Sequence, residues 1–109
     1  MLEGLFGNRT VEKILFSLQT YGEGYATGMA RLYNEPVNKI QQQLKRLENA
    51  GIVVSRLIGR TRIYTLNPAY PFIKELAALI ERALQFVPTG EAERYYRRRT
   101  RPRRTGKPL

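Results

Sequence analysis

The sequence contains no cysteine, no histidine and no aspartate among its 109 residues. Without cysteine and histidine there are no disulfides, no thiolate chemistry, no zinc sites of the Cys/His type and no ordinary general base. No glycine-rich phosphate-binding loop is present, and the nine acidic residues, all glutamates, form no visible cluster that would hold a metal. We therefore expect no enzymatic activity, no cofactor and no metal site.

Long hydrophobic runs are also missing. The longest apolar segment, Leu76–Phe86, is interrupted by Glu81 and Arg82, which is unsuitable for a membrane-spanning helix. Near the start of the chain, Glu3 and Arg9 interrupt the apolar residues, so the pattern is not that of a signal peptide. The sequence therefore predicts a cytoplasmic protein without a membrane partner.

Negative charge is scarce: the sequence has nine glutamates against 19 lysines and arginines, which gives a formal net charge of +10. Such a balance attracts polyanions, with nucleic acid first and an anionic membrane second. Residues 87–109 carry seven Arg and one Lys against two Glu, a net charge of +6 in about a fifth of the length. We expect one domain over residues 1–86 and a basic tail over 87–109. A ribosome-like or merely soluble basic protein is the simpler alternative.

Two helices are predicted in the first third of the chain. Over residues 9–20, apolar side chains recur at helical spacing, and Asn8 can cap the helix. That stripe consists of Val11, Ile14, Leu15 and Leu18. Thr27 can open a short second helix, which Gly28 weakens by about 1 kcal/mol relative to alanine, so this helix needs tertiary support.

The third helix, about residues 37–50, is the clearest element. It follows a turn that contains Pro36 and is stopped by Gly51. Its apolar stripe consists of Val37, Ile40, Leu44 and Leu47. Its opposite surface is polar and cationic, with Asn38, Lys39, Gln41, Gln42, Lys45 and Arg46, whereas Gln43 points more toward the scaffold.

The periodicity changes between residues 52 and 67. Two β-branched segments flank a tight turn at Gly59 and Arg60, which predicts a β-hairpin. The wing spans about residues 57–62, and its tip is residues 58–61. The tip is cationic because Arg56, Arg60 and Arg62 lie on or beside it, next to Thr61.

A fourth helix is predicted over residues 72–86. Its apolar stripe is too broad for one small core to cover, so a second copy of the chain is a natural partner. The predicted dimerisation residues are Leu76, Leu79, Ile80, Ala83 and Leu84.

Three helices followed by a hairpin predict a mainly α fold with a small β-hairpin, the winged helix-turn-helix, with a C-terminal dimerisation helix. In that fold the third helix enters the DNA major groove, and arginines of the wing grip phosphates or the minor groove. The predicted DNA-binding residues are Thr27, Asn38, Lys39, Gln41, Gln42, Lys45, Arg46, Arg56, Arg60, Thr61 and Arg62.

Two motifs in combination resemble the ArsR-type winged helix. The first is Leu-Lys-Arg-Leu-x-x-Ala-Gly-Ile at residues 44–52, and the second is Gly-Arg-x-x-x-Tyr-x-Leu-Asn at residues 59–67, preceded by Met29–Leu32 and Pro36. The resemblance implies a homodimer, built from the first and last helices, that reads successive major grooves. This sequence departs from the metal-sensing members of that family, whose sensor sites use cysteine or histidine. Residues 5–10 also resemble a branch of stand-alone winged helices, some of which are attached to or encoded beside nucleotidyltransferases.

The sequence therefore predicts a sequence-specific, double-stranded DNA-binding transcription regulator, with two alternatives. One is an architectural or non-specific nucleic-acid binder driven by the tail. The tail arginines are Arg94, Arg97, Arg98, Arg99, Arg101, Arg103 and Arg104. The other is a protein-interaction module that docks an acidic partner. Residues 91–99 can form a helix in which Tyr95 and Tyr96 either stack on bases or dock on the domain.

Overall fold

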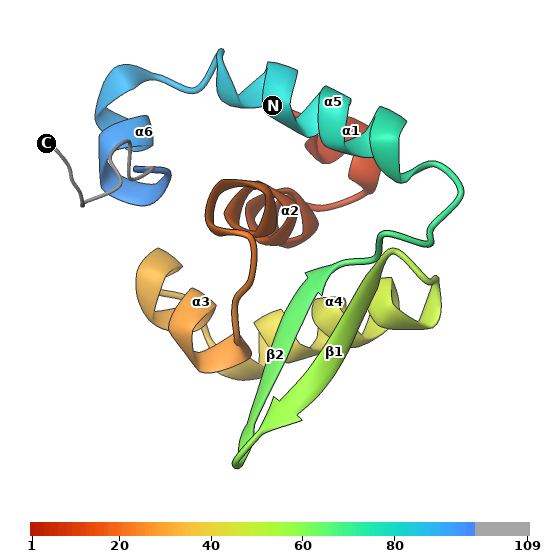
Figure 1. Cartoon of the computed structure of the whole chain (residues 1–109). Coiled ribbons are helices and arrows are strands. Elements are labelled where there is room, and N and C mark those ends of the chain that lie inside the picture. Colours follow the sequence, from red (N-terminus) through yellow and green to blue (C-terminus); the bar gives the residue numbers. More distant parts are fainter. Residues whose placement is uncertain (98–109) are drawn as a thin grey trace, which may run out of the picture.

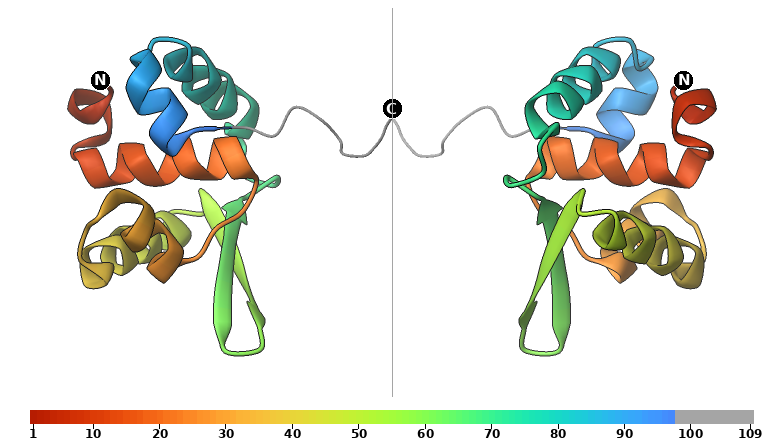
Figure 2. Two further views of the ribbon diagram at one scale, coloured as in Figure 1. Left: turned by 90° about the vertical axis from the view of Figure 1, so that its left-hand side faces the viewer. Right: turned by 90° about the vertical axis from the view of Figure 1, so that its right-hand side faces the viewer.

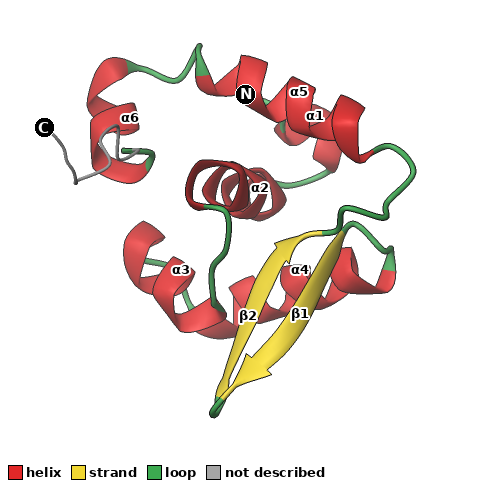
Figure 3. Ribbon diagram, viewed as in Figure 1, coloured by secondary structure: helices red, strands yellow, loops and turns green. Residues whose placement is uncertain are grey.

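The computed structural model describes residues 1–97, which form six helices and one two-stranded antiparallel hairpin (Figures 1 and 3). In chain order the elements are α1 (Glu3–Phe6), α2 (Arg9–Tyr21), α3 (Ala26–Tyr33), α4 (Val37–Asn49), β1 (Val53–Ile58), β2 (Thr61–Leu66), α5 (Ile73–Leu84) and α6 (Thr89–Tyr95). This is the predicted mainly helical fold with a wing. The apolar residues at the N-terminus, which show no clear period in the sequence, form the short helix α1.

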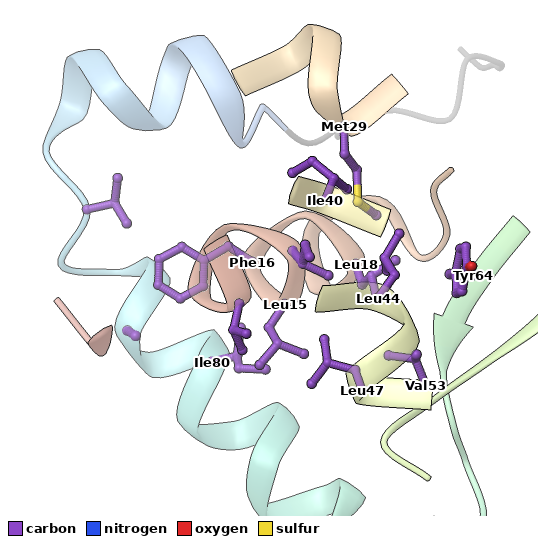
Figure 4. Close-up of a cluster of buried hydrophobic side chains, with 14 residues drawn as sticks. Leu15, Phe16, Leu18, Met29, Ile40, Leu44, Leu47, Val53, Tyr64 and Ile80 are labelled. Carbon is purple, nitrogen blue, oxygen red and sulfur yellow. The ribbon is translucent and has the colours of Figure 1, made fainter. Parts of the chain in front are cut away.

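Helix α2 lies at the centre of the molecule. Helices α5 and α6 cover one side of it, and α3, α4 and the hairpin lie on the other (Figures 1 and 2). Ile14 of α2, Ile40 of α4 and Ile80 of α5 are all completely buried (Figure 4). The predicted apolar stripe of α2 is confirmed, since Val11, Ile14, Leu15 and Leu18 all belong to the core. Burial of α2 from two directions thus joins the helices into one core.

The helix ends follow the expected chemistry with small shifts. The side chain of Asn8 caps α2 by accepting a hydrogen bond of 2.7 Å from the backbone N–H of Val11. Helix α3 begins at Ala26 rather than Thr27, and Thr27 lies exposed in its first turn. Helix α4 begins at Val37, directly after Pro36, as predicted. Thr27 and the predicted polar residues of α4 therefore lie on their expected helices, whereas positions 72 and 86 of the predicted fourth helix lie just outside α5.

Packing explains why position 28 is a glycine, and this reason was not evident from the sequence. The ring of Tyr25 lies across it, so a Cβ at position 28 would come within 2.9 Å of that ring. Glycine at position 28 therefore lets Tyr25 pack over the start of α3 through a local contact.

The hairpin is anchored at its base. Its register runs from Val53 opposite Leu66 to Ile58 opposite Thr61, which leaves Gly59 and Arg60 as a two-residue turn. Gly59 has a φ of +63°, as such turns require.

The loop between α2 and α3 binds the hairpin along the edge of β2 that is not paired with β1. Gly24 and Tyr64 exchange two backbone hydrogen bonds, in which the Gly24 nitrogen donates at 3.0 Å and the Tyr64 nitrogen at 2.7 Å. The wing is therefore fixed to the helices at its base and projects beyond them at its tip (Figure 2).

The face that helix α5 turns toward solvent differs from the face that was predicted from the sequence. Ile80 and Ala83 are only 0% and 6% exposed because they pack in the core, so the prediction that they contact a second chain is wrong for this structure. Leu76 and Leu84 are partly buried against the same core, and Leu79 is exposed. Phe72 and Phe86, just beyond the two ends of α5, are also exposed.

The chain does not leave the domain at residue 87. Val87 is buried, and after it α6 returns to pack on α2 and α3. The ring of Tyr96 meets the edge of Phe16 at 5.5 Å between centroids, and the ring of Tyr95 lies 5.2 Å from that of Tyr33. Composition changes at Pro88, whereas packing continues to Tyr96, so we place residues 87–96 with the domain.

Helix α6 is shorter than the sequence allowed, since it ends at Tyr95 rather than near residue 99. Among the helices of residues 1–97, none combines the length and the apolar character needed to cross a bilayer.

Candidate nucleic-acid interface

A groove of about 530 Å³ lies between α4, the start of α3 and the tip of the wing. Six residues predicted from the sequence line it together: Thr27, Gln41, Lys45, Arg60, Thr61 and Arg62. They come from three separate elements, and the anchored base of the hairpin brings them to one place. Five lining residues were not predicted: Tyr25, Ala26, Glu48, Asn49 and Tyr64.

The polar residues of α4 divide into three directions, because successive residues of a helix are turned by about 100°. Gln41 and Lys45 face the groove. Asn38 and Gln42 lie opposite the buried stripe and are exposed to solvent. These four side chains form the surface that α4 can present to a large partner.

Lys39 and Arg46 point to the other flank of α4, away from the wing. Lys39 lies 3.3 Å from Glu35 in an ion pair, and Arg46 lines an apolar cavity beside Leu5 and Phe72. Gln43 faces the scaffold as expected, since it accepts a hydrogen bond from the Asn8 amide.

The wing arginines are not equivalent. Because strand residues alternate between two faces, Arg56, which is opposite Ile63, and Arg62, which is opposite Leu57, lie on different faces of the hairpin. Arg62 faces the groove, whereas Arg56 pairs with Glu23 at 2.9 Å. Arg56 was predicted from the sequence to bind DNA together with Arg60 and Arg62. In the structure Arg56 lies outside the groove that those two arginines line.

The carboxylate of Glu35 ties the turn before α4 to its neighbours. It pairs with Lys13 of α2 and with Lys39 of α4. The hydrogen bond from Lys13, followed by that from Lys39, lowers the pKa of Glu35 below its ordinary value of 4.5, against the opposing effect of burial. Glu35 thus fixes the position of α4 relative to α2 by charge as well as by packing.

Tyr64 forms part of the groove wall. Burial, and then the nearby Glu48 carboxylate, raise the pKa of its hydroxyl above 10.0. The side chain is therefore neutral at physiological pH and can act as a hydrogen-bond donor in the groove.

The described part of the tail, residues 87–97, lies away from this groove. Arg94 and Arg97 are exposed on and just after α6, which packs on the opposite side of α2 from the wing (Figures 1 and 2). The guanidinium of Arg94 lies over the ring of Tyr95 at 5.3 Å. The other predicted tail contacts, Arg98, Arg99, Arg101, Arg103 and Arg104, lie outside the described residues.

Solved structures resemble this arrangement. A MarR family transcriptional regulator of Silicibacter pomeroyi DSS-3 aligns with a TM-score of 0.59 and 18% identity, over 77% of this chain and 60% of that chain. YusO of Bacillus subtilis aligns with a TM-score of 0.58 and 17% identity, over 84% and 73%. The adhesin competence repressor AdcR of Streptococcus pyogenes aligns with a TM-score of 0.53 and 20% identity, over 84% and 78%.

These likenesses define the fold class, and the chain is a winged helix-turn-helix protein. This chain spans about 60% of the length of the Silicibacter regulator. No protein-family profile matches the sequence, and no curated protein matches it either. One of these structures is a MarR family transcriptional regulator. The likenesses do not support the narrower ArsR-type resemblance.

Glu35→Gln should make the stability of the protein less dependent on acid pH. The wild-type carboxylate contributes stability above its ordinary pKa of 4.5, and this contribution is lost as the pH falls through the lowered value. We expect the variant to be less stable than the wild type by about 1 kcal/mol at pH 7, the upper size for a partly exposed ion pair. Urea denaturation at pH 7 and pH 3 measures the difference, which should shrink in acid. An equal difference in stability at both pH values would contradict a stabilising role for the ionised Glu35 carboxylate.

Proposed function

We propose that the protein is a sequence-specific, double-stranded DNA-binding transcription regulator that acts as a homodimer. The observation that carries this proposal is the single surface on which the open face of α4, the groove and the cationic wing tip meet. The structural likeness to transcriptional regulators supports the same class of function. Binding to DNA, rather than chemistry on a substrate, accounts for the kinds of side chain gathered there.

The recognition helix supplies groups suited to base edges. Asn38, Gln41 and Gln42 carry amides that can bind adenine through two hydrogen bonds, and Lys45 can reach guanine acceptors or phosphate. Arg60 at the wing tip has the length and charge to enter a narrow minor groove or hold a phosphate. The amides then give sequence preference, and the cations give affinity that depends on salt.

The tail supports a second candidate, a largely non-specific nucleic-acid binder. Residues 98–109 carry five Arg and one Lys with no acid, a net charge of +6, whereas residues 1–97 have a net charge of +4. Such a charge also fits an acidic protein. The regulator is preferred because the groove cations and amides lie on the folded domain, where their geometry is fixed.

The outward face of α5 supports the homodimer. Phe72, Leu79 and Phe86 recur every seven residues, or about two helical turns, and are 63%, 38% and 62% exposed. Leu5 of α1 is exposed beside them and shares the wall of an apolar cavity of about 470 Å³ with Phe72 and Leu79. These exposed apolar side chains suit contact with a second copy.

The charges on the same face suit an antiparallel pairing. Exposed Glu75 and Arg82 lie on either side of Leu79. If two α5 helices cross about a twofold axis at Leu79, Phe72 of one meets Phe86 of the other, and Glu75 approaches Arg82. The face is therefore complementary to itself in shape and in charge.

Selection of bound fragments from random duplexes, read by sequencing, tests the main proposal. A recovered motif with half-sites about 10 bp apart is the expected result. Gln42→Ala should relax the preference at its base pair, with a cost of about 1–3 kcal/mol there. Arg60→Ala should lower affinity for all duplexes and reduce the salt slope by about 0.9.

Arg56→Ala is the matched control for that experiment, because Arg56 lies on the other face of the same hairpin. It should change affinity less than Arg60→Ala does. The proposal fails if the wild-type chain enriches no motif, or if Gln42→Ala selects the wild-type motif unchanged.

A chain ending at Arg97 separates the regulator from the non-specific binder, since it retains α6 and its tyrosine contacts. Under the main proposal this chain keeps the motif but shows a shallower salt dependence of affinity. Loss of all binding, measured by fluorescence anisotropy at several salt concentrations, would instead favour the tail-driven binder.

Leu79→Glu should weaken self-association by about 100-fold, because it puts two like charges at the centre of an apolar interface. Sedimentation velocity measures this change. Glu75→Arg and Arg82→Glu should each weaken the dimer, and the double exchange should restore it. A monomeric wild-type chain, or a double exchange no better than the single changes, would exclude this interface.

A further inference from the structure

A chain of two hydrogen bonds connects the recognition helix to the wing. The hydroxyl oxygen of Ser55 in β1 lies 2.6 Å from Oε2 of Glu48 in α4. Nη1 of Arg62 in β2 donates to the same hydroxyl oxygen at 3.0 Å. A carboxylate only accepts and a guanidinium only donates, so the Ser55 hydroxyl must donate to Glu48 and accept from Arg62.

Strand pairing explains why these side chains meet. Ser55 is opposite Tyr64, and Arg62 is opposite Leu57, so Ser55 and Arg62 are diagonal neighbours on one face of the hairpin. Long side chains span such diagonals. Glu48, Arg62 and Tyr64 all line the groove, which identifies this as the face turned toward α4.

The three wing arginines differ in what holds them. Arg62 is bonded toward the groove, and Arg56 is held by Glu23 on the opposite face. Arg60 at the turn has no hydrogen-bonding partner within residues 1–97. Of these three, only Arg62 is both in the groove and oriented by the protein itself.

We propose that Ser55 is a positioning residue, which together with Glu48 holds the Arg62 guanidinium over the groove for contact with DNA. This proposal rests on the proposed function. An arginine that is ordered before binding loses less side-chain freedom when it meets a phosphate or the minor groove. The same chain of bonds couples the wing to α4, so that the two surfaces meet the duplex in a fixed relation.

The role of the hydrogen bonds can be separated from that of the Glu48 charge. Glu48→Gln removes the negative charge but leaves an amide oxygen that accepts from Ser55. Ser55→Ala removes both hydrogen bonds and changes no charge. Positioning therefore predicts that Ser55→Ala lowers affinity although it changes no charge in the groove.

A double-mutant cycle tests whether Ser55 acts through Arg62. We expect Ser55→Ala to weaken binding to the selected duplex by about two- to tenfold, and Ser55→Thr, which keeps the hydroxyl, to restore it. In an Arg62→Ala background, Ser55→Ala should have no further effect. Fluorescence anisotropy at one salt concentration gives the four dissociation constants.

Thr65→Ala is the matched control, because it removes a hydroxyl from the outer face of the same hairpin. The proposal is overturned if Ser55→Ala binds as the wild type does, if its effect persists in the Arg62→Ala background, or if Thr65→Ala weakens binding equally. The last result would indicate a general loss of hairpin stability.

Side-chain NMR of Arg62 in the free protein distinguishes failure of this proposal from failure of the proposed function. If the wild-type chain binds no duplex, DNA binding itself is wrong and the positioning role falls with it. If the chain binds DNA but the Arg62 guanidinium is as mobile in the wild type as in Ser55→Ala, only the positioning role is wrong.

Discussion

Helix α2 is shielded from water on two sides, by α4 on one and by α5 on the other, and its residues Ile14, Leu15 and Leu18 are almost completely buried. This double burial decides the orientation of both neighbours. Because Ile40 and Leu44 must face α2, the polar residues of α4 must face outward. Because Ile80 must face α2, Leu79 faces solvent and becomes available to a second chain. The candidate DNA surface and the candidate dimer surface thus follow from one core.

Charge pairing then divides the cations into two groups. Outside the groove, Lys39 is held by Glu35, and Arg56 is held by Glu23. Inside the groove, Lys45, Arg60 and Arg62 form no ion pair within residues 1–97. A phosphate approaching the groove therefore meets positive charge that does not have to be released from a carboxylate. The one acid there, Glu48, is occupied with Ser55.

Much of the fold could be predicted from the sequence, because its signals are local. The spacing of apolar residues located α2 and α4, Asn8 marked the start of α2, and the Gly59 turn marked the wing. Six groove residues were also identified, since open polar positions on a helix or at a hairpin tip can be read from periodicity. Ser55 was missed, although it lies two residues after buried Val53 and therefore on the same face of β1, the face toward α4.

The sequence by itself determined the elements from α2 to α5, their order and the excess of positive charge, because these depend on neighbouring residues and on composition. Only the tertiary structure decided which cations are open and which face of α5 is free. Glu35 reaches Lys13 and Glu23 reaches Arg56 across long stretches of chain, and no local pattern encodes such pairs. Likewise, Tyr95 and Tyr96 stand among arginines in the sequence, yet they dock on Phe16 and Tyr33, since the packed rings exclude more water there than they would in an extended tail.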